Sequence, residues 1–159
     1  FARDFGAQGY TDAAAMLAKV KPDFADIATT VASHRPLVEL AARHSRAVIC
    51  QKPFAETLPD GAAMVAACDA AGIPLLVHEN FRWQSPYRAL GTALASGVIG
   101  APTFLRLSFR HAFDIYANQP YLATVEDLAL TDVGPHLFDM ARFLMGDVAR
   151  ADCQAPRLN

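Results

Sequence analysis

The sequence lacks the features that mark several large classes of protein. No uninterrupted apolar run approaches the ~20 residues that a membrane-spanning helix requires, and the N-terminal segment lacks the charged-then-apolar order of a signal peptide. Lys and Arg number 14 against 16 Asp and Glu, and no basic run could follow a phosphate backbone. We therefore expect neither a membrane nor a nucleic acid as a partner.

Cysteine is also scarce. The three cysteines, Cys50, Cys68 and Cys153, show no CxxC pair and no spacing typical of metal ligands. An odd number of cysteines in a chain of this size indicates reduced thiols. We therefore expect a cytoplasmic protein that has no metal site.

What the sequence does contain is apolar material for a packed core. Hydrophobic residues make up 53% of the 159 residues and charged residues 19%, a composition typical of a folded protein. This length suits one domain or two partial ones. Because the chain begins with Phe1 rather than Met, we expect it to be part of a longer protein.

The first half alternates between helical and strand-like patterns. Short apolar stretches at 24–29, 47–50 and 75–77 are typical of buried parallel strands. Between them, Ser33 is a candidate N-cap for a helix carrying Leu37 and Leu40, and Thr57 with Asp60 resembles a capping box. Such alternation predicts a parallel α/β sheet.

The pattern changes after Asn80. A helix is expected from Ser85-Pro86 to Gly97, and another ends at Gly146. Between them, residues 103–111 alternate strictly between apolar and polar side chains, which predicts a strand with one wetter face.

The predicted fold class is therefore α/β with two parts. Residues 1–80 would form the second half of a Rossmann-type parallel sheet, a partial dinucleotide-binding domain. Residues 81–159 would form the start of an α/β domain with a large, open, mainly antiparallel sheet.

The first candidate chemical group follows the second predicted strand. Ligands of open parallel sheets bind beyond the carboxyl ends of the strands, where Thr29-Thr30 and Gln51-Lys52-Pro53 lie. Pro53 biases Lys52 toward an extended backbone, from which its ammonium could donate a hydrogen bond to a substrate hydroxyl. The alternative is a solvated loop lysine.

The second candidate is the pair Asp132 and His136. Four residues apart, they lie on one helical face, or on an entry loop and first turn if Pro135 begins the helix. A carboxylate near an imidazole can orient it and raise its basicity, as a general base requires. The alternative is a helix-entry anion beside a packing histidine.

Several segments together resemble one family. They are Ile27-Ala28-Thr29-Thr30 with His34, Val48 to Pro53, Asn80-Phe81-Arg82, the turn Gly97 to Gly100, and Asp132-x-x-x-His136. Their order and distances over essentially the whole chain are similar to those of the Gfo/Idh/MocA oxidoreductases.

The resemblance implies an NAD- or NADP-dependent enzyme that transfers hydride to or from a sugar, polyol or related hydroxy compound. It implies His136 as general base, Lys52 as the group that polarises the substrate oxygen, and Asp132 as a substrate-positioning carboxylate. It also implies a homo-oligomer, a dimer or tetramer, and cofactor contacts from a further set of residues: Thr29, Thr30, His34, Gln51, Lys52 and Asn80.

The sequence departs from the family pattern at three points. Gln51 stands where the family usually has Glu, Thr30 stands where Pro is common, and no GxGxxG fingerprint occurs. Because glycine amides at a helix N-terminus normally hold the pyrophosphate, the chain by itself is expected to bind NAD(P) poorly.

Three other functions remain open from the sequence. A relative could use the nicotinamide for imine or tetrapyrrole reduction, or for a transient oxidation that permits elimination or glycoside cleavage. A non-catalytic sensor is a second reading, and a simple binding module is a third.

Overall fold

A computed structural model describes residues 2–110 and 112–154 and divides the chain into two compact units. The first unit extends to His78, and the second begins at Glu79. Within the described ranges, every helix is too short or too polar to pass through a bilayer.

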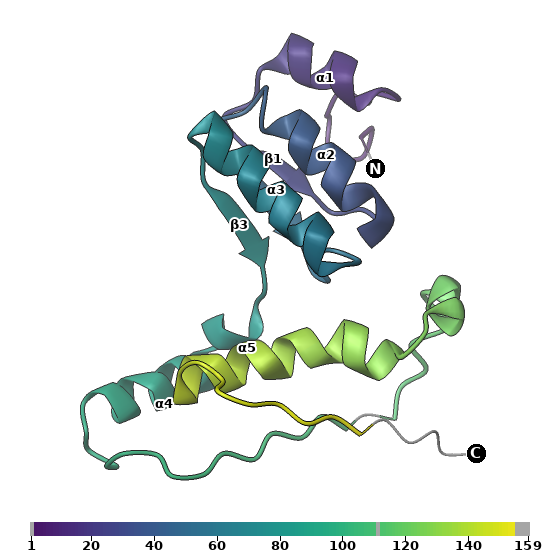
Figure 1. Ribbon diagram of the computed structural model, residues 1–159. Helices are drawn as coiled ribbons and strands as arrows, with labels where there is room; N and C mark the ends of the chain where they lie inside the picture. The colour runs from purple at the N-terminus through teal and green to yellow at the C-terminus, as the bar shows by residue number, and fades with distance from the viewer. Residues whose placement is uncertain (1, 111, 155–159) are drawn as a thin grey trace. The chain divides into compact units, whose positions relative to one another are not determined.

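The first unit is a parallel α/β layer (Figure 1). Three strands pair in the order β1-β2-β3, and three α-helices accompany them. The strands are β1 (Ala25–Ile27), β2 (Val48–Gln51) and β3 (Leu75–His78), and the helices are α1 (Ala13–Val20), α2 (His34–Ala41) and α3 (Leu58–Ala71). This confirms the parallel sheet predicted from the first half of the sequence.

Local signals explain where the helices begin and end. Asp12 accepts hydrogen bonds from the amides of Ala14 and Ala15, and the Thr57 hydroxyl accepts one from the Asp60 amide. Helix α3 ends at Gly72, whose φ of 67° lies in the left-handed region that glycine adopts without strain. One prediction was wrong: the Ser33 hydroxyl does not cap α2.

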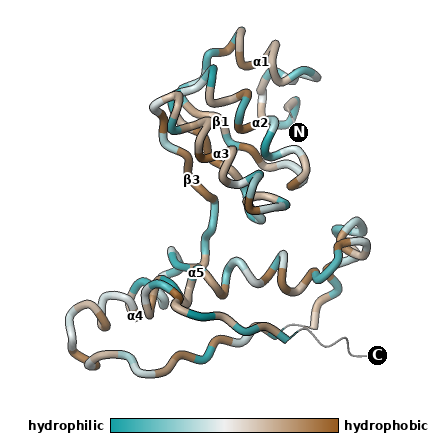
Figure 2. The backbone as a smooth tube through the Cα atoms, viewed as in Figure 1, coloured by the Kyte–Doolittle hydropathy of each residue, from teal (hydrophilic) through white to brown (hydrophobic). Residues whose placement is uncertain are grey.

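The core of the first unit lies between the sheet and its helices. Val48 and Cys50 of β2 alternate with less buried neighbours, and they pack in one cluster with Val38, Met64 and Cys68 of the helices. Burial raises the pKa of the Cys50 thiol to about 11, because a thiolate would lose its hydration there. Figure 2 shows the hydrophobic colouring on β3 that marks such strands.

The second unit is helical in the described residues. Its helices are η2 (Phe81–Trp83), α4 (Ser85–Ala95), η3 (Pro120–Thr124), the π-helical turn η4 (Ala129–Val133) and α5 (Gly134–Met145). Helices α4 and α5 approach closely at Gly91, where an added Cβ would lie 2.6 Å from the Phe143 ring.

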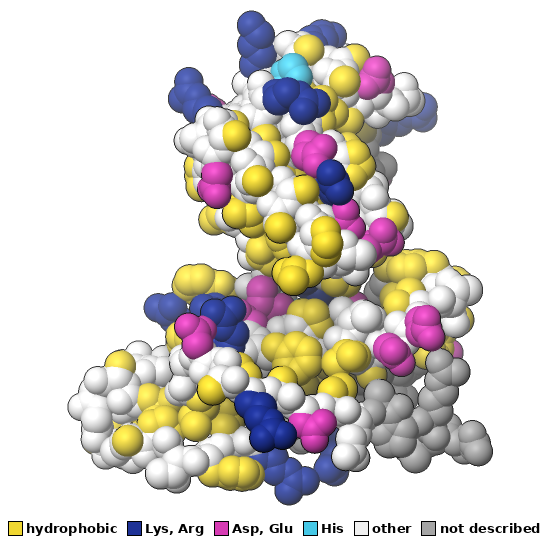
Figure 3. Space-filling model, viewed as in Figure 1, with side chains coloured by type: hydrophobic (Ala, Val, Ile, Leu, Met, Phe, Trp, Pro, Cys, Tyr) yellow, Lys and Arg dark blue, Asp and Glu magenta, His cyan; other side chains and the backbone are white. Residues whose placement is uncertain are grey.

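The prediction of a strand at 103–111 was wrong over its described residues. Residues 103–110 form no strand, and His111 lies outside the described residues. No antiparallel sheet occurs in the described part of this unit. The alternating pattern defines two faces, but a strand also needs a neighbouring chain to complete its backbone hydrogen bonds. Without one, Phe104 remains 81% exposed, among hydrophobic side chains that reach the surface of this unit (Figure 3).

Replacing Met64 with Ala tests the core. The side chain is fully buried, so its removal should lower the free energy of unfolding by about 2–5 kcal/mol. Val65→Ala on the same helix, at a side chain 45% exposed, should cost less than about 1 kcal/mol. Urea unfolding measures both, and equal losses would contradict the assigned packing.

Candidate active site

The carboxyl ends of the three strands align at one edge of the sheet in the first unit. The register pairs Ile27 with Cys50, and Cys50 with Val77, so the segments that follow leave the sheet at similar levels. Polar residues occupy those segments, as expected where parallel sheets bind ligands.

The loop after β1 carries two of the predicted cofactor contacts. Thr29 and Thr30 are exposed, and the Ser33 hydroxyl donates to the Thr30 carbonyl at 2.7 Å while its oxygen lies 2.7 Å from the Thr29 hydroxyl, from which it can accept. Ser33 therefore fixes this loop instead of capping the next helix.

Buried His34 connects two of these strand-end loops. Its Nδ1 lies 3.1 Å from the Phe54 carbonyl, and its Nε2 lies 3.2 Å from the Thr29 carbonyl. A neutral imidazole carries one N–H and can donate to only one of these carbonyls at a time. With both ring nitrogens against the backbone and 1% exposure, His34 holds the loops in place, and a direct cofactor contact stays a prediction.

The loop after β2 carries Gln51 and Lys52. The Lys52 amide donates to Gln51 Oε1 at 2.9 Å, Gln51 Nε2 lies 3.4 Å from His78 Nδ1, and the Lys52–Pro53 peptide bond is cis. Gln51 therefore holds the backbone that carries Lys52 and also reaches across to β3. These contacts do not test the catalytic role predicted for Lys52 or the cofactor contacts predicted for both residues, which stay predictions.

In the second unit, Asp132 and His136 lie on helices of different kinds. Asp132 lies in the π turn η4, and His136 lies in the first turn of α5. The Gly134 amide donates to the Ala129 carbonyl five residues earlier, and such π turns are frequent at functional sites. Both side chains are partly buried.

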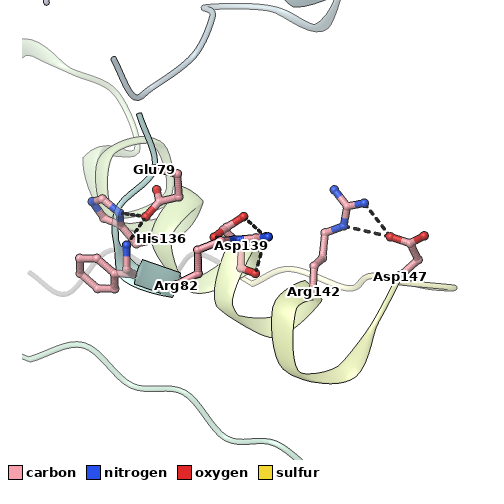
Figure 4. A network of polar contacts seen from close by, with 7 residues as sticks. Glu79, Arg82, His136, Asp139, Arg142 and Asp147 are labelled. Atoms are coloured by element: carbon pink, nitrogen blue, oxygen red, sulfur yellow. Dashed lines mark hydrogen bonds and ion pairs between the residues drawn. The ribbon is translucent and has the colours of Figure 1, made fainter. Parts of the chain in front are cut away.

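The carboxylate that contacts the His136 imidazole at Nδ1 is Glu79, a residue that the sequence analysis missed (Figure 4). Glu79 Oε1 lies 2.7 Å from Nδ1, and the two side chains are only 10% and 12% exposed. The available signal was an acidic residue directly after a predicted strand and directly before Asn80-Phe81-Arg82.

The neighbours of Glu79 complete the arrangement. The Phe81 ring stacks on the His136 ring with centroids 4.1 Å apart, and Arg82 forms a two-pronged ion pair with Asp139 (Figure 4). Asn80 is exposed and makes no side-chain cap of η2. Three successive contacts thus join the segment 79–82 to one face of α5.

The described residues contain no cluster of three or more His, Cys, Asp or Glu side chains suited to a metal ion. Their chemistry is instead that of polar donors at a sheet edge and a buried carboxylate–imidazole pair.

Comparison with known proteins identifies relatives of both units. Residues 1–79 match the model of an oxidoreductase family with an NAD-binding Rossmann fold, and residues 87–159 match the GFO/IDH/MocA C-terminal domain.

D-apiose dehydrogenases are among the similar curated proteins. The one from Paraburkholderia graminis is 58% identical over 94% of this chain, and the one from Rhizobium rhizogenes is 54% identical over 94%. An oxidoreductase from Agrobacterium radiobacter, solved with NAD+, L-tartaric acid and magnesium, is 52% identical over 98% of this chain with a TM-score of 0.89. The chain spans 40%, 44% and 47% of these three proteins, respectively.

Replacing His34 tests its structural role. His34→Ala removes a fully buried ring and the one hydrogen bond that it donates to a loop carbonyl, so the free energy of unfolding should fall by about 2–4 kcal/mol. His44→Ala, at an exposed histidine just after α2, is the control and should change stability by less than about 0.5 kcal/mol. Urea unfolding of both variants is the measurement, and a stable His34→Ala protein would exclude this role.

Proposed function

Because the chain belongs to the Gfo/Idh/MocA family of oxidoreductases, we propose that the full-length protein is an NAD-dependent sugar dehydrogenase whose substrate is D-apiose or a closely related sugar. The observation that carries this proposal is the 58% identity with a D-apiose dehydrogenase across 94% of the chain. In this assignment, residues 1–80 belong to the dinucleotide-binding domain and residues 81–159 to the substrate domain.

The residues at the sheet edge fit one end of a nicotinamide nucleotide. Thr29 and Thr30 present exposed hydroxyls, and the side-chain amide of Gln51 lies at the end of the next strand. Such groups suit a ribose or a carboxamide, both of which accept and donate hydrogen bonds. Exposed Asn80 offers a further amide. The glycine loop that would hold the pyrophosphate is not among these 159 residues.

In the proposed reaction, His136 Nε2 removes the proton from the substrate hydroxyl. The Lys52 ammonium donates a hydrogen bond to the same oxygen and stabilises its developing negative charge. Asp132 positions the sugar through its remaining hydroxyls. The bound nicotinamide supplies the acceptor for the hydride that leaves the substrate carbon.

The proposal also covers the cellular location and the oligomeric state of the enzyme. We place it in the cytoplasm as a homo-oligomer, a dimer or tetramer.

Turnover of D-apiose tests the substrate. The full-length protein should reduce NAD+ with D-apiose, with kcat/KM at least about 10-fold above that for myo-inositol, because a site built for one set of hydroxyls leaves its polar groups unpaired with another. Absorbance of the reduced nicotinamide measures both rates. NAD binding without oxidation of any sugar or polyol would overturn the enzyme assignment in favour of a sensor.

Alanine variants test the catalytic residues. His136→Ala and Lys52→Ala should each lower kcat about 100- to 10,000-fold while leaving the Kd for NAD nearly unchanged. Lys52→Arg should restore little, because a planar guanidinium does not reproduce a compact ammonium. Lys19→Ala on α1 is a control that should leave kcat as in the wild type. Near-normal kcat in both alanine variants would make Lys52 and His136 structural residues.

A further inference from the structure

Glu79 is a largely buried ionisable side chain to which the family resemblance assigns no role. It leaves the end of β3, is only 10% exposed, and its Oε2 has no hydrogen-bond partner among the described residues. A buried, half-satisfied carboxylate costs stability, so its presence calls for a physical reason.

The other oxygen of Glu79 is fully engaged. Oε1 accepts the Phe81 backbone N–H at 2.9 Å and lies 2.7 Å from His136 Nδ1. An ionised carboxylate can only accept hydrogen bonds, so Nδ1 must carry the proton. The neutral imidazole is then the Nδ1–H tautomer, and the lone pair lies on Nε2.

Two further contacts hold the ring. The Phe81 ring stacks on the imidazole with an interplanar angle of 10°, which restrains the ring plane. Arg82 Nε donates to Asp139 Oδ2 at 2.6 Å, and a second guanidinium nitrogen donates to Oδ1, which anchors η2 one turn further along α5. Both contacts come from the segment that carries Glu79.

We propose that Glu79 is the positioning residue for the general base: it holds His136 as the Nδ1–H tautomer and stabilises the imidazolium formed when Nε2 takes the substrate proton. The O–H bond of the substrate breaks, an Nε2–H bond forms, and the Nδ1 proton stays on the ring. The proposal rests on the proposed role of His136.

Among the hydrogen bonds of the described residues, the carboxylate at His136 Nδ1 is that of Glu79. Arg82 is paired with Asp139, and that hydrogen bond is the main reason that its pKa is raised, with a smaller contribution from attraction to Glu79. Asp132 lies on the preceding π turn and is reserved for the sugar in the proposed function. Glu79 is therefore the carboxylate whose removal should alter the basicity of His136.

Glu79→Gln is the decisive variant, because it keeps the shape and the acceptor oxygen but removes the negative charge. A carboxylate favours the imidazolium, so its loss makes the ring easier to deprotonate. In sugar oxidation by the full-length enzyme, the inflection at which kcat/KM rises with pH should move to lower pH. The plateau of kcat should fall about 10- to 100-fold, because Nε2 becomes a weaker base.

Asp147→Asn is the matched control. It removes a carboxylate from the far end of α5, where Asp147 pairs with Arg142 at the surface. Its pH profile should coincide with that of the wild type. A Glu79→Gln profile that also coincides with the wild type would overturn the proposal and reduce Glu79 to a structural residue.

An imidazole NMR measurement separates this proposal from the proposed function. The ¹⁵N shifts of His136 should report the Nδ1–H tautomer in the wild type and its loss in Glu79→Ala. An Nε2–H tautomer in the wild type would refute the role of Glu79 whatever the activity. Full turnover by His136→Ala with the expected tautomer present would instead refute the catalytic assignment of His136.

Discussion

The parallel pairing of β1, β2 and β3 is the constraint on which the first unit depends. Parallel strands must all run in one direction, so each connection has to return across the sheet, and α2 and α3 make these returns. The same pairing brings the three carboxyl ends to one edge. Backbone hydrogen bonding between the strands therefore brings polar residues that are distant in sequence, such as Thr29 and His78, to the same edge of the sheet.

The second unit depends on a different device. The segment 79–82 contacts α5 at two positions: Glu79 and Phe81 both contact His136, and Arg82 pairs with Asp139 one turn further along the helix. Helix α5 is therefore held by polar and stacking contacts as well as by its buried apolar side chains, Met140 and Leu144.

The site departs from the family pattern at Gln51 without losing its local structure. The side-chain oxygen of Gln51 accepts the Lys52 amide at 2.9 Å, a bond that a Glu carboxylate could also make. What Gln51 cannot provide is a negative charge beside the lysine.

Local information was sufficient for much of the first unit. Asp12, Thr57 and Gly72 act on neighbours a few residues away, so the ends of α1 and α3 could be read from the sequence, and short apolar stretches identified the strands. The candidate strand at 103–111 was wrong over its described residues because alternation sets the two faces of a strand and leaves its pairing undetermined.

The partner of His136 needed the tertiary structure. Asp132, four residues away along the chain, was the carboxylate expected beside His136, yet the one at Nδ1 comes from Glu79, 57 residues away. A hydrogen bond depends on distance and direction in space, which sequence spacing specifies only within a helix or a turn. The sequence by itself determined the α/β layer and the residue types available for chemistry. Only the packing of η2 on α5 decided which carboxylate holds the imidazole.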